Sequence, residues 1–227
     1  MEKKKILFLI MFVLISLLAL QISISKIIGS NQSFTLFELL GPTGGMFLGP
    51  VLGAVSAFFV RALNIVIFHQ KLDFLTVIRF LPMMLAAVYF GFKSKKTAII
   101  FPVCILLFLL NPVGRQAWAY SLIWLIPFFA TFGKKRLVLN SLGATFTAHA
   151  VGSVIFLYSF PMAPQAWLSL IPIVFIERGF FTAGIWVSCV AFNTILDKAT
   201  NLKLTSGLKH FVNKDYVVSL RFLKHFA

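Results

Sequence analysis

The chain has 227 residues, of which 59% are hydrophobic and only 12% are charged, and its formal net charge is +15. Soluble domains carry about 25% charged residues, so this composition excludes an ordinary soluble protein and indicates a polytopic membrane protein. The lysines lie in short segments between apolar runs, as the positive-inside rule expects, so the charge does not indicate a nucleic-acid partner. We expect an all-α transmembrane helical bundle over residues 1–196 and a basic amphipathic cytoplasmic tail over residues 197–227.

The first apolar run, ILFLIMFVLISLLALQISIS, follows the basic start MEKKK. Its length of about 20 residues is that of a helix crossing a bilayer. The apolar core of a secretory signal peptide is shorter, about 7–15 residues, and residues 23–26 make a poor cleavage site. We therefore interpret this run as the first transmembrane helix.

The later apolar segments are separated by glycine, proline and charged residues. They lie at 34–48, 50–68, 74–92, 97–111, 116–132, 137–160 and 165–196. The segment 34–48 is short and rich in glycine and proline, so we expect a broken helix that crosses the membrane or a re-entrant one. The fold class is thus a bundle of about seven or eight membrane segments, with six full spans plus a broken segment as the other possibility.

Basic residues between these segments predict the orientation of the chain. The clusters are Lys93 with Lys95 and Lys96, Lys134 with Lys135 and Arg136, and the tail that begins at Lys198. All three are expected on the cytoplasmic side, and two spans lie between successive clusters, so the assignment is self-consistent. We expect a multi-pass protein of the cell membrane with a cytoplasmic C-terminus.

This orientation brings most of the polar side chains of the apolar segments to one level, towards the outer leaflet. The set comprises Glu38, Arg61, Asn64, Arg79, Arg115, Glu177 and Arg178, with His149 near mid-depth. Charged side chains at bilayer depth need partners or a wet cavity, and arginine is suited to bidentate capture of carboxylate or phosphate. Because four arginines face two glutamates, we predict an outward-opening pocket that binds a small anionic or polar solute. The alternative is structural ion pairing, with Arg61 and Arg79 reaching lipid headgroups.

Metal, cofactor and catalytic motifs are not expected. Cys104 and Cys189 lie in apolar runs without the spacing of metal ligands, so we predict neither a metal site nor a disulfide. His149 has Thr145 and Thr147 nearby but no accompanying catalytic motif. A lone membrane histidine of this kind is more often a hydrogen-bonding group between helices. An intramembrane enzyme with His149 or Glu177 as its base is therefore the least favoured function.

A family resemblance lies in the first half of the chain. The sequence LFELLGPTGGMFLGPVLGAVSAFFVRALNIVIF, followed by FLTVIRFLPMMLAAVYFG, resembles the substrate-binding S components of energy-coupling-factor transporters, over roughly residues 1–100. The resemblance implies capture of a vitamin or related micronutrient near the outer face and docking onto a transmembrane scaffold subunit driven by ATPase subunits. It also implies that Glu38 and residues 41–45 belong to the loop that covers the solute. Such a protein does no chemistry alone.

A second function class is structural. The chain is also similar to the rod-shape membrane proteins that organise cell-wall synthesis, which have short N-terminal helices and few polar motifs. A scaffold of that kind would not need four buried arginines, so we rank it below solute binding.

The tail changes the composition of the chain. Six lysines and arginines alternate there with apolar residues, opposed by Asp197 and Asp215. The pattern predicts one or two amphipathic helices that lie on the cytoplasmic leaflet and bind anionic lipid.

Overall fold

The computed structural model describes residues 3–26, 33–92, 95–133, 136–199, 209 and 211–218. Within these ranges the fold is all-α apart from one two-stranded hairpin. Four helical stretches are long and apolar enough to cross a membrane, namely Pro50–Ile67, Phe74–Gly91, Leu137–Ser159 and Ile171–Ala199. Two shorter apolar helices are Lys5–Leu20 and Trp118–Thr131. These candidate spans identify an integral membrane protein built from several membrane helices.

The elements follow the apolar segments of the sequence. The first half contains α1 (Lys3–Leu20), β1 (Ser23–Lys26), β2 (Ser33–Thr35), α2 (Phe37–Leu40), α3 (Thr43–Leu48), α4 (Pro50–Ile67), α5 (Phe74–Ile78) and α6 (Leu81–Gly91). The second half contains η1 (Lys95–Ile99), α7 (Ile100–Leu110), α8 (Pro112–Gln116), α9 (Trp118–Ser121), η2 (Leu122–Trp124), α10 (Leu125–Thr131), α11 (Leu137–Ser159), α12 (Pro164–Ser169), α13 (Ile171–Ala199) and η4 (Lys214–Tyr216).

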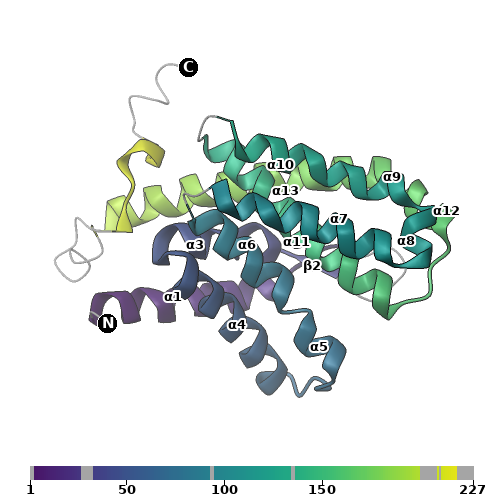
Figure 1. The fold of residues 1–227 in the computed structure, drawn as a ribbon. Coiled ribbons are helices and arrows are strands. Elements are labelled where there is room, and N and C mark those ends of the chain that lie inside the picture. The colour runs from purple at the N-terminus through teal and green to yellow at the C-terminus, as the bar shows by residue number, and fades with distance from the viewer. Residues whose placement is uncertain are drawn as a thin grey trace.

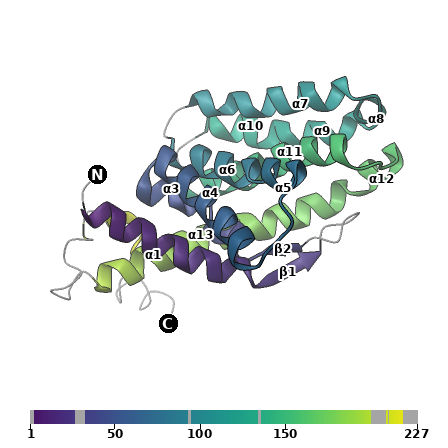
Figure 2. The same cartoon turned by 90° about the horizontal axis from the view of Figure 1, so that it is seen from below.

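Successive segments run in alternating directions, so the bundle has two distinct ends (Figure 1). The start of α1, the end of α13 and helix α3 lie at one end, which we call the basic end because Lys5, Lys95, Arg136, Lys198 and Lys214 belong to it. Helices α5, α8 and α12 lie at the opposite end, which we call the hairpin end. Figure 2 shows the β1–β2 hairpin beside α13.

The segment 34–48 runs from one level of the bundle to the other. It is broken at Gly41 and Pro42, between α2 and α3. Glu38 in α2 pairs with Arg61 near the end of α4, whereas Gly45 in α3 lies against Gly53 near the start of α4. The two short helices therefore contact α4 at different depths, and the crossing of the membrane by this segment stays a prediction.

Glycines allow α3, α4 and α6 to approach closely. A Cβ atom on Gly53 would stand 2.5 Å from the backbone nitrogen of Gly45, and one on Gly91 would stand 2.6 Å from the Gly45 carbonyl oxygen. The turn between α3 and α4 needs Gly49, whose φ of 85° is costly for other residues, and Pro50 then begins α4. The small residues of the sequence thus serve close helix packing, as in other membrane bundles.

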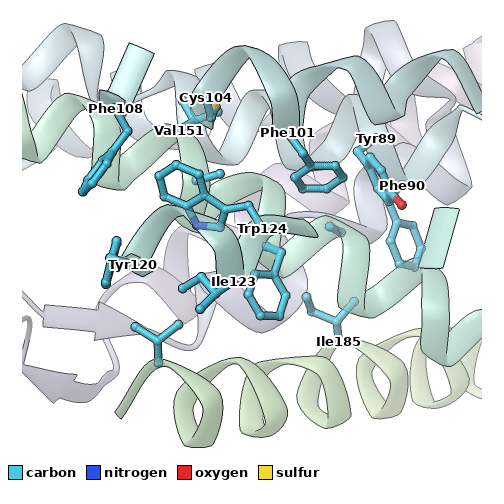
Figure 3. Packing of buried hydrophobic residues seen from close by; sticks show 14 of the residues in the cluster. Tyr89, Phe90, Phe101, Cys104, Phe108, Tyr120, Ile123, Trp124, Val151 and Ile185 are labelled. Atoms are coloured by element: carbon cyan, nitrogen blue, oxygen red, sulfur yellow. The ribbon is translucent and has the colours of Figure 1, made fainter. Parts of the chain in front are cut away.

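The larger hydrophobic core lies between α7, the α9–α10 region, α11 and α13. Trp124 is completely buried and packs edge-on against Phe108 at a centroid distance of 5.4 Å and against Tyr120 at 6.0 Å (Figure 3). These aromatic side chains fix the relative positions of the helices that form the wall of the site described below.

The hairpin was not expected. Helix α1 ends at Leu20, so the end of the predicted first helix is wrong, and β1 pairs antiparallel with β2 through Ser25 opposite Phe34 and Lys26 opposite Ser33. The alternating sequence of residues 22–26 suits a strand, whose side chains point to opposite faces.

Asp73 is the N-cap of α5. Its side chain accepts a hydrogen bond from the Thr76 backbone N–H at 2.7 Å, which lowers the pKa of Asp73.

The described part of the tail does not form the expected amphipathic helix. Phe211 is buried and stacks on Phe8 of α1 at 4.6 Å, and the backbone N–H of Asn213 donates to Asn193 of α13 at 2.8 Å. Only the short η4 follows, and Lys214 forms an ion pair with Asp197. This segment is held by aromatic packing and hydrogen bonds to α1 and α13; the predicted helices over the remainder of 197–227 lie outside the described residues.

Candidate functional site

A cavity of about 220 Å³ lies towards the hairpin end of the bundle. Its walls come from the hairpin, α2, α4, the α5–α6 junction, α9, α11, α12 and α13. Five charged side chains belong to its lining, and most of the other lining residues are aromatic or aliphatic. Pockets of this composition, with a few convergent polar groups, are the usual form of a small-molecule site.

Six of the eight predicted site residues line this cavity. They are Glu38, Arg61, Arg79, His149, Glu177 and Arg178. They come from segments far apart in the sequence, and the fold brings them around one cavity.

Arg61 and Glu38 form the first charged pair of the cavity. The Arg61 Nη2 atom lies 3.0 Å from Glu38 Oε1, and the guanidinium also lies over the ring of Phe37 at 5.4 Å. The Nε–H of Arg61 is buried and has no hydrogen-bond acceptor among the described residues. The pair ties α2 to α4 and neutralises one carboxylate.

Arg178 is the most deeply buried charge, with 3% of its surface exposed. Its guanidinium donates to Glu177 at 3.3 Å and to Thr145 at 3.4 Å. The rings of Phe34 and Phe181 lie against it, with centroids 5.0 and 4.6 Å from Cζ, where cation–π attraction is strong. Its Nε–H has no acceptor among the described residues, although buried donors are usually paired.

Arg79 is the third arginine of the cavity lining, and neither glutamate of the lining forms a salt bridge with it. It is half-buried at the C-terminus of α5, and its Cζ lies 5.4 Å from the centre of the Phe160 ring. Within the described residues, its side chain forms no salt bridge and no hydrogen bond. With Glu38 assigned to Arg61 and Glu177 to Arg178, the lining of the cavity has one more cation than anions, and the acidic group that interacts electrostatically with Arg79 is the exposed Asp73 outside the lining.

His149 occupies the centre of a hydrogen-bond network between α9, η2 and α11. The indole N–H of Trp124 donates to His149 Nδ1 at 3.1 Å, so Nδ1 carries no proton. We therefore assign the proton of the neutral ring to Nε2, which lies 3.0 Å from the hydroxyl of Tyr120. The Tyr120 hydroxyl in turn lies 3.3 Å from Ser153. This arrangement is that of a neutral structural histidine.

The aromatic lining was missed at the level of sequence. Phe34, Phe156, Phe160 and Trp167 all face the cavity, and Trp167 lies edge-on to Tyr120 at 5.0 Å. Trp167 is 2% exposed, and its indole N–H has no acceptor among the described residues. The signal in the sequence is that five of the eight tryptophans and tyrosines lie in the segments 118–124 and 158–167.

Asn64 and Arg115 are not among the residues that line the cavity. Asn64 accepts a hydrogen bond from Gln21 at 2.8 Å and thereby joins α4 to the end of α1. Arg115 is exposed in α8 and points to the Leu109 carbonyl oxygen at 3.5 Å. Without Arg115 the cationic excess of the cavity is one charge, instead of the two expected from the sequence.

A second cavity, of about 350 Å³, lies at the basic end. It contains none of the predicted site residues, and its two cations, Lys95 and Arg136, are exposed to solvent. Tyr89 lies 2.7 Å from Thr131, and Asn140 donates to the Phe90 carbonyl at 3.1 Å. The cavity with the converging arginines is therefore the stronger candidate for a site.

The described residues contain no cluster of three or more histidine, cysteine or acidic side chains. Cys104 and Cys189 are buried free thiols.

Comparison with known proteins does not assign a function to this chain. The chain is similar to the uncharacterized protein MJ0923 of Methanocaldococcus jannaschii, with 27% identity over 247 aligned residues that cover 97% of this chain and 82% of that protein. No protein-family model matches the chain, and no solved structure gives a significant match. The function is therefore argued from the cavity itself.

Proposed function

We propose that this membrane protein binds a small anionic or polar solute for uptake, in the manner of an S component of an energy-coupling-factor transporter. The observation that carries the proposal is the Arg79 guanidinium, which lines the cavity and forms no salt bridge within the described residues, so that its opposite charge is only the exposed Asp73 outside the cavity. An unpaired charge in a low-dielectric cavity is costly, and an anionic ligand relieves that cost. The aromatic walls supply the apolar contact area that a small-molecule site needs.

The direction of uptake follows from the charged residues of the basic end. Lys5, Lys95 and Arg136 belong to this end, and positive residues favour the cytoplasm. The cavity then opens towards the external side, and the C-terminus is cytoplasmic. Lys209 and Lys214 of the tail would then contact anionic lipid of the inner leaflet, where each contributes about 1 kcal/mol.

Energy for transport would come from partners. As in the S components that the chain resembles, a transmembrane scaffold subunit with ATPase subunits would drive release of the solute into the cell. The protein itself is then a binding protein and no enzyme. A structural scaffold, the alternative suggested by the sequence, gives no reason for Arg79 to face a cavity.

Binding by the purified protein tests this proposal. We expect the thermal unfolding temperature to rise with at least one member of a panel of water-soluble vitamins and small carboxylates. Arg79→Gln should weaken that binding by about tenfold or more, because a charge-assisted hydrogen bond is lost. Arg115→Gln is the matched control, since it removes an exposed arginine outside the cavity and should leave the affinity unchanged.

A protein that is stabilised by no member of the panel would instead favour the scaffold. Equal loss of binding in both arginine variants would show that the cavity is not the site.

A further inference from the structure

The second cavity, of about 350 Å³ at the basic end, has cations but no anion in its described lining. Lys95 and Arg136 belong to this lining, which contains neither aspartate nor glutamate. Within the described residues, no salt bridge involves either cation. The arginine-lined cavity, in contrast, sets two glutamates against its three arginines. The second cavity therefore has the larger excess of positive charge.

Both cations are accessible to a ligand. Lys95 and Arg136 are exposed to solvent. The Lys95 Nζ atom lies 5.7 Å from the centre of the Phe132 ring, a cation–π contact that keeps the ammonium beside the end of α10. Arg136 is the N-cap of α11, and its side chain makes no capping hydrogen bond. Neither cation has to give up a carboxylate partner before it receives an anion.

The tail and the start of α11 add further attraction for an anion. Asn213 of the tail lines the cavity, and its side-chain carbonyl accepts from the Asp215 backbone N–H at 3.0 Å, so its amide NH2 group remains as a donor. Leu137, the first residue of α11, also lines the cavity, and the first turn of this helix contains no acidic residue. The start of a long helix carries partial positive charge.

The cavity lies at the level where apolar helices end. Gly91 ends α6, Thr131 ends α10 and Leu137 begins α11, and all three residues line it. Two candidate membrane spans, Phe74–Gly91 and Leu137–Ser159, thus have one end at this cavity. The end of a membrane span marks the boundary between the hydrocarbon and the lipid headgroups. A charged headgroup in the leaflet at the basic end is therefore within reach of the cavity.

Phosphate has the chemistry that these groups recognise. It brings negative charge and several acceptor oxygens, which arginine receives with paired N–H groups and lysine with a point charge. Basic pockets between membrane helices on the cytoplasmic side bind anionic headgroups in other proteins. A volume of about 350 Å³ lies within the range of small-molecule sites, about 300–1,000 Å³.

We propose that the second cavity binds a phosphate group, carried by an anionic phospholipid of the leaflet at the basic end or by a free phosphate compound. Arg136 receives two phosphate oxygens, Lys95 supplies the second positive charge, and the amide of Asn213 donates a hydrogen bond. This site is separate from the arginine-lined cavity, so it does not depend on the proposed uptake of a solute.

Binding to the purified full chain tests the proposal. The protein is washed in detergent until its phosphorus content reaches background, and binding is then measured by thermal shift and calorimetry. The lipid probes are dioctanoyl phosphatidylglycerol, dioctanoyl phosphatidylcholine and dioctanoylglycerol, and the free probes are glycerol phosphate and inorganic phosphate. We expect phosphatidylglycerol to bind and dioctanoylglycerol, which has no phosphate, not to bind. Phosphatidylcholine, whose choline cation offsets the phosphate charge, should bind at least about tenfold more weakly.

Variants locate the binding. Arg136→Gln should weaken phosphatidylglycerol by about tenfold or more, because a charge-assisted pair of hydrogen bonds is lost. Lys198→Gln is the matched control, since it removes an exposed cation at the same end but outside the cavity lining, and it should leave the affinity unchanged. Ala130→Phe adds a ring at a lining position without changing the charge and should also weaken binding. Thermal unfolding without ligand shows that each variant is folded.

The free probes identify the source of the phosphate. If glycerol phosphate or inorganic phosphate binds as tightly as phosphatidylglycerol, with the same dependence on Arg136, the ligand is a free phosphate compound. If only phosphatidylglycerol binds, the ligand is the lipid. Both results support a phosphate site.

Three results would overturn this site. Equal loss of binding in Arg136→Gln and Lys198→Gln would show diffuse attraction to the basic end. Equal binding of phosphatidylglycerol and either uncharged or zwitterionic lipid would show that the acyl chains are recognised. The third is absence of binding by every phosphate probe.

Discussion

The hydrogen bond from Trp124 decides what His149 can do. An indole N–H can only donate, so it holds Nδ1 of the histidine unprotonated, and the remaining ring proton is directed to the Tyr120 hydroxyl. A base that must accept a proton at Nδ1 would first have to break this bond. At the scale of single residues, the arrangement favours positioning of Tyr120 at the cavity wall over catalysis.

Replacement of this histidine tests the network. His149→Phe leaves the buried Trp124 N–H without an acceptor, and we expect about 1–2 kcal/mol of destabilisation, since membrane hydrogen bonds contribute up to about 1.7 kcal/mol. The measurement is equilibrium unfolding in detergent. The control is Tyr158→Phe, at a residue on the same helix as His149. It removes an exposed hydrogen bond to the Leu107 carbonyl of α7, so a smaller effect is expected.

A double-mutant cycle with Trp124→Phe shows whether the two groups act as a pair. The double variant should be less destabilised than the sum of the single variants. Strict additivity would contradict the assigned bond.

Sequence reasoning found the charged residues of the cavity better than its other lining. Depth along a helix can be read from the sequence, and it brought Arg61, Arg79 and Arg178 to one level. The direction in which a side chain points around the helix cannot be read when the helix is apolar on all sides. For this reason the sequence did not reveal that Asn64 faces the end of α1, although it lies at a similar depth to Arg61. The rings of Phe156 and Trp167 were missed because buried and lipid-facing aromatics look alike in sequence.

At the scale of the helices, the contact between α3 and α6 has no room for a side chain. A Cβ atom on Gly45 would lie far inside van der Waals contact with the Ala87 carbonyl oxygen. That neighbour is backbone, which cannot rotate out of the way. A substitution there must move one helix relative to the other.

Gly45→Ala should therefore destabilise the fold by about 1–3 kcal/mol, the range for overpacked sites. Gly179→Ala is the matched control, because its Cβ meets no atom within 4 Å and alanine is favoured over glycine inside a helix by about 1 kcal/mol. Opposite signs in thermal unfolding are expected. An unchanged unfolding temperature for Gly45→Ala would mean that α3 and α6 are too far apart for the added methyl group to clash.

The short elements were the least predictable. A continuous apolar run predicted one helix through residue 25, but the chain leaves α1 at Leu20 and forms β1. The pairing partner of β1 lies beyond the next loop, and helical periodicity carries no information about it. The break of 34–48 was foreseen because Gly41 and Pro42 act locally, within the segment that they interrupt.

At the scale of the molecule, basic residues lie at both ends of the bundle. Lys5, Lys95 and Arg136 lie at the basic end, whereas Lys26, Lys71 and Arg115 lie at the hairpin end, towards which the arginine-lined cavity also lies. Sequence reasoning gave the alternating path, since hydropathy and the positive-inside rule act over whole segments. It could not give the packing partners of each helix.

Single-cysteine labelling tests the orientation in intact cells. Gln116→Cys, at the hairpin end, should react with a membrane-impermeant maleimide, whereas Lys95→Cys should react only after the cells are opened. The native Cys104 and Cys189 are buried and should stay silent in the parent protein. The reverse pattern would turn the cavity towards the cytoplasm and contradict uptake from outside.

The stacking of Phe211 on Phe8 has a consequence for how the protein is made. The two rings are separated by nearly the whole described chain, so the ribosome completes almost every helix before this contact can form. Until then the aromatic face of α1 near Phe8 also lacks Phe192, which comes from the late part of α13. Helix α1, which is made before the other described helices, is thus among the last to acquire its final neighbours, and chains that stall during synthesis would leave this phenylalanine cluster open to lipid or to quality-control proteases.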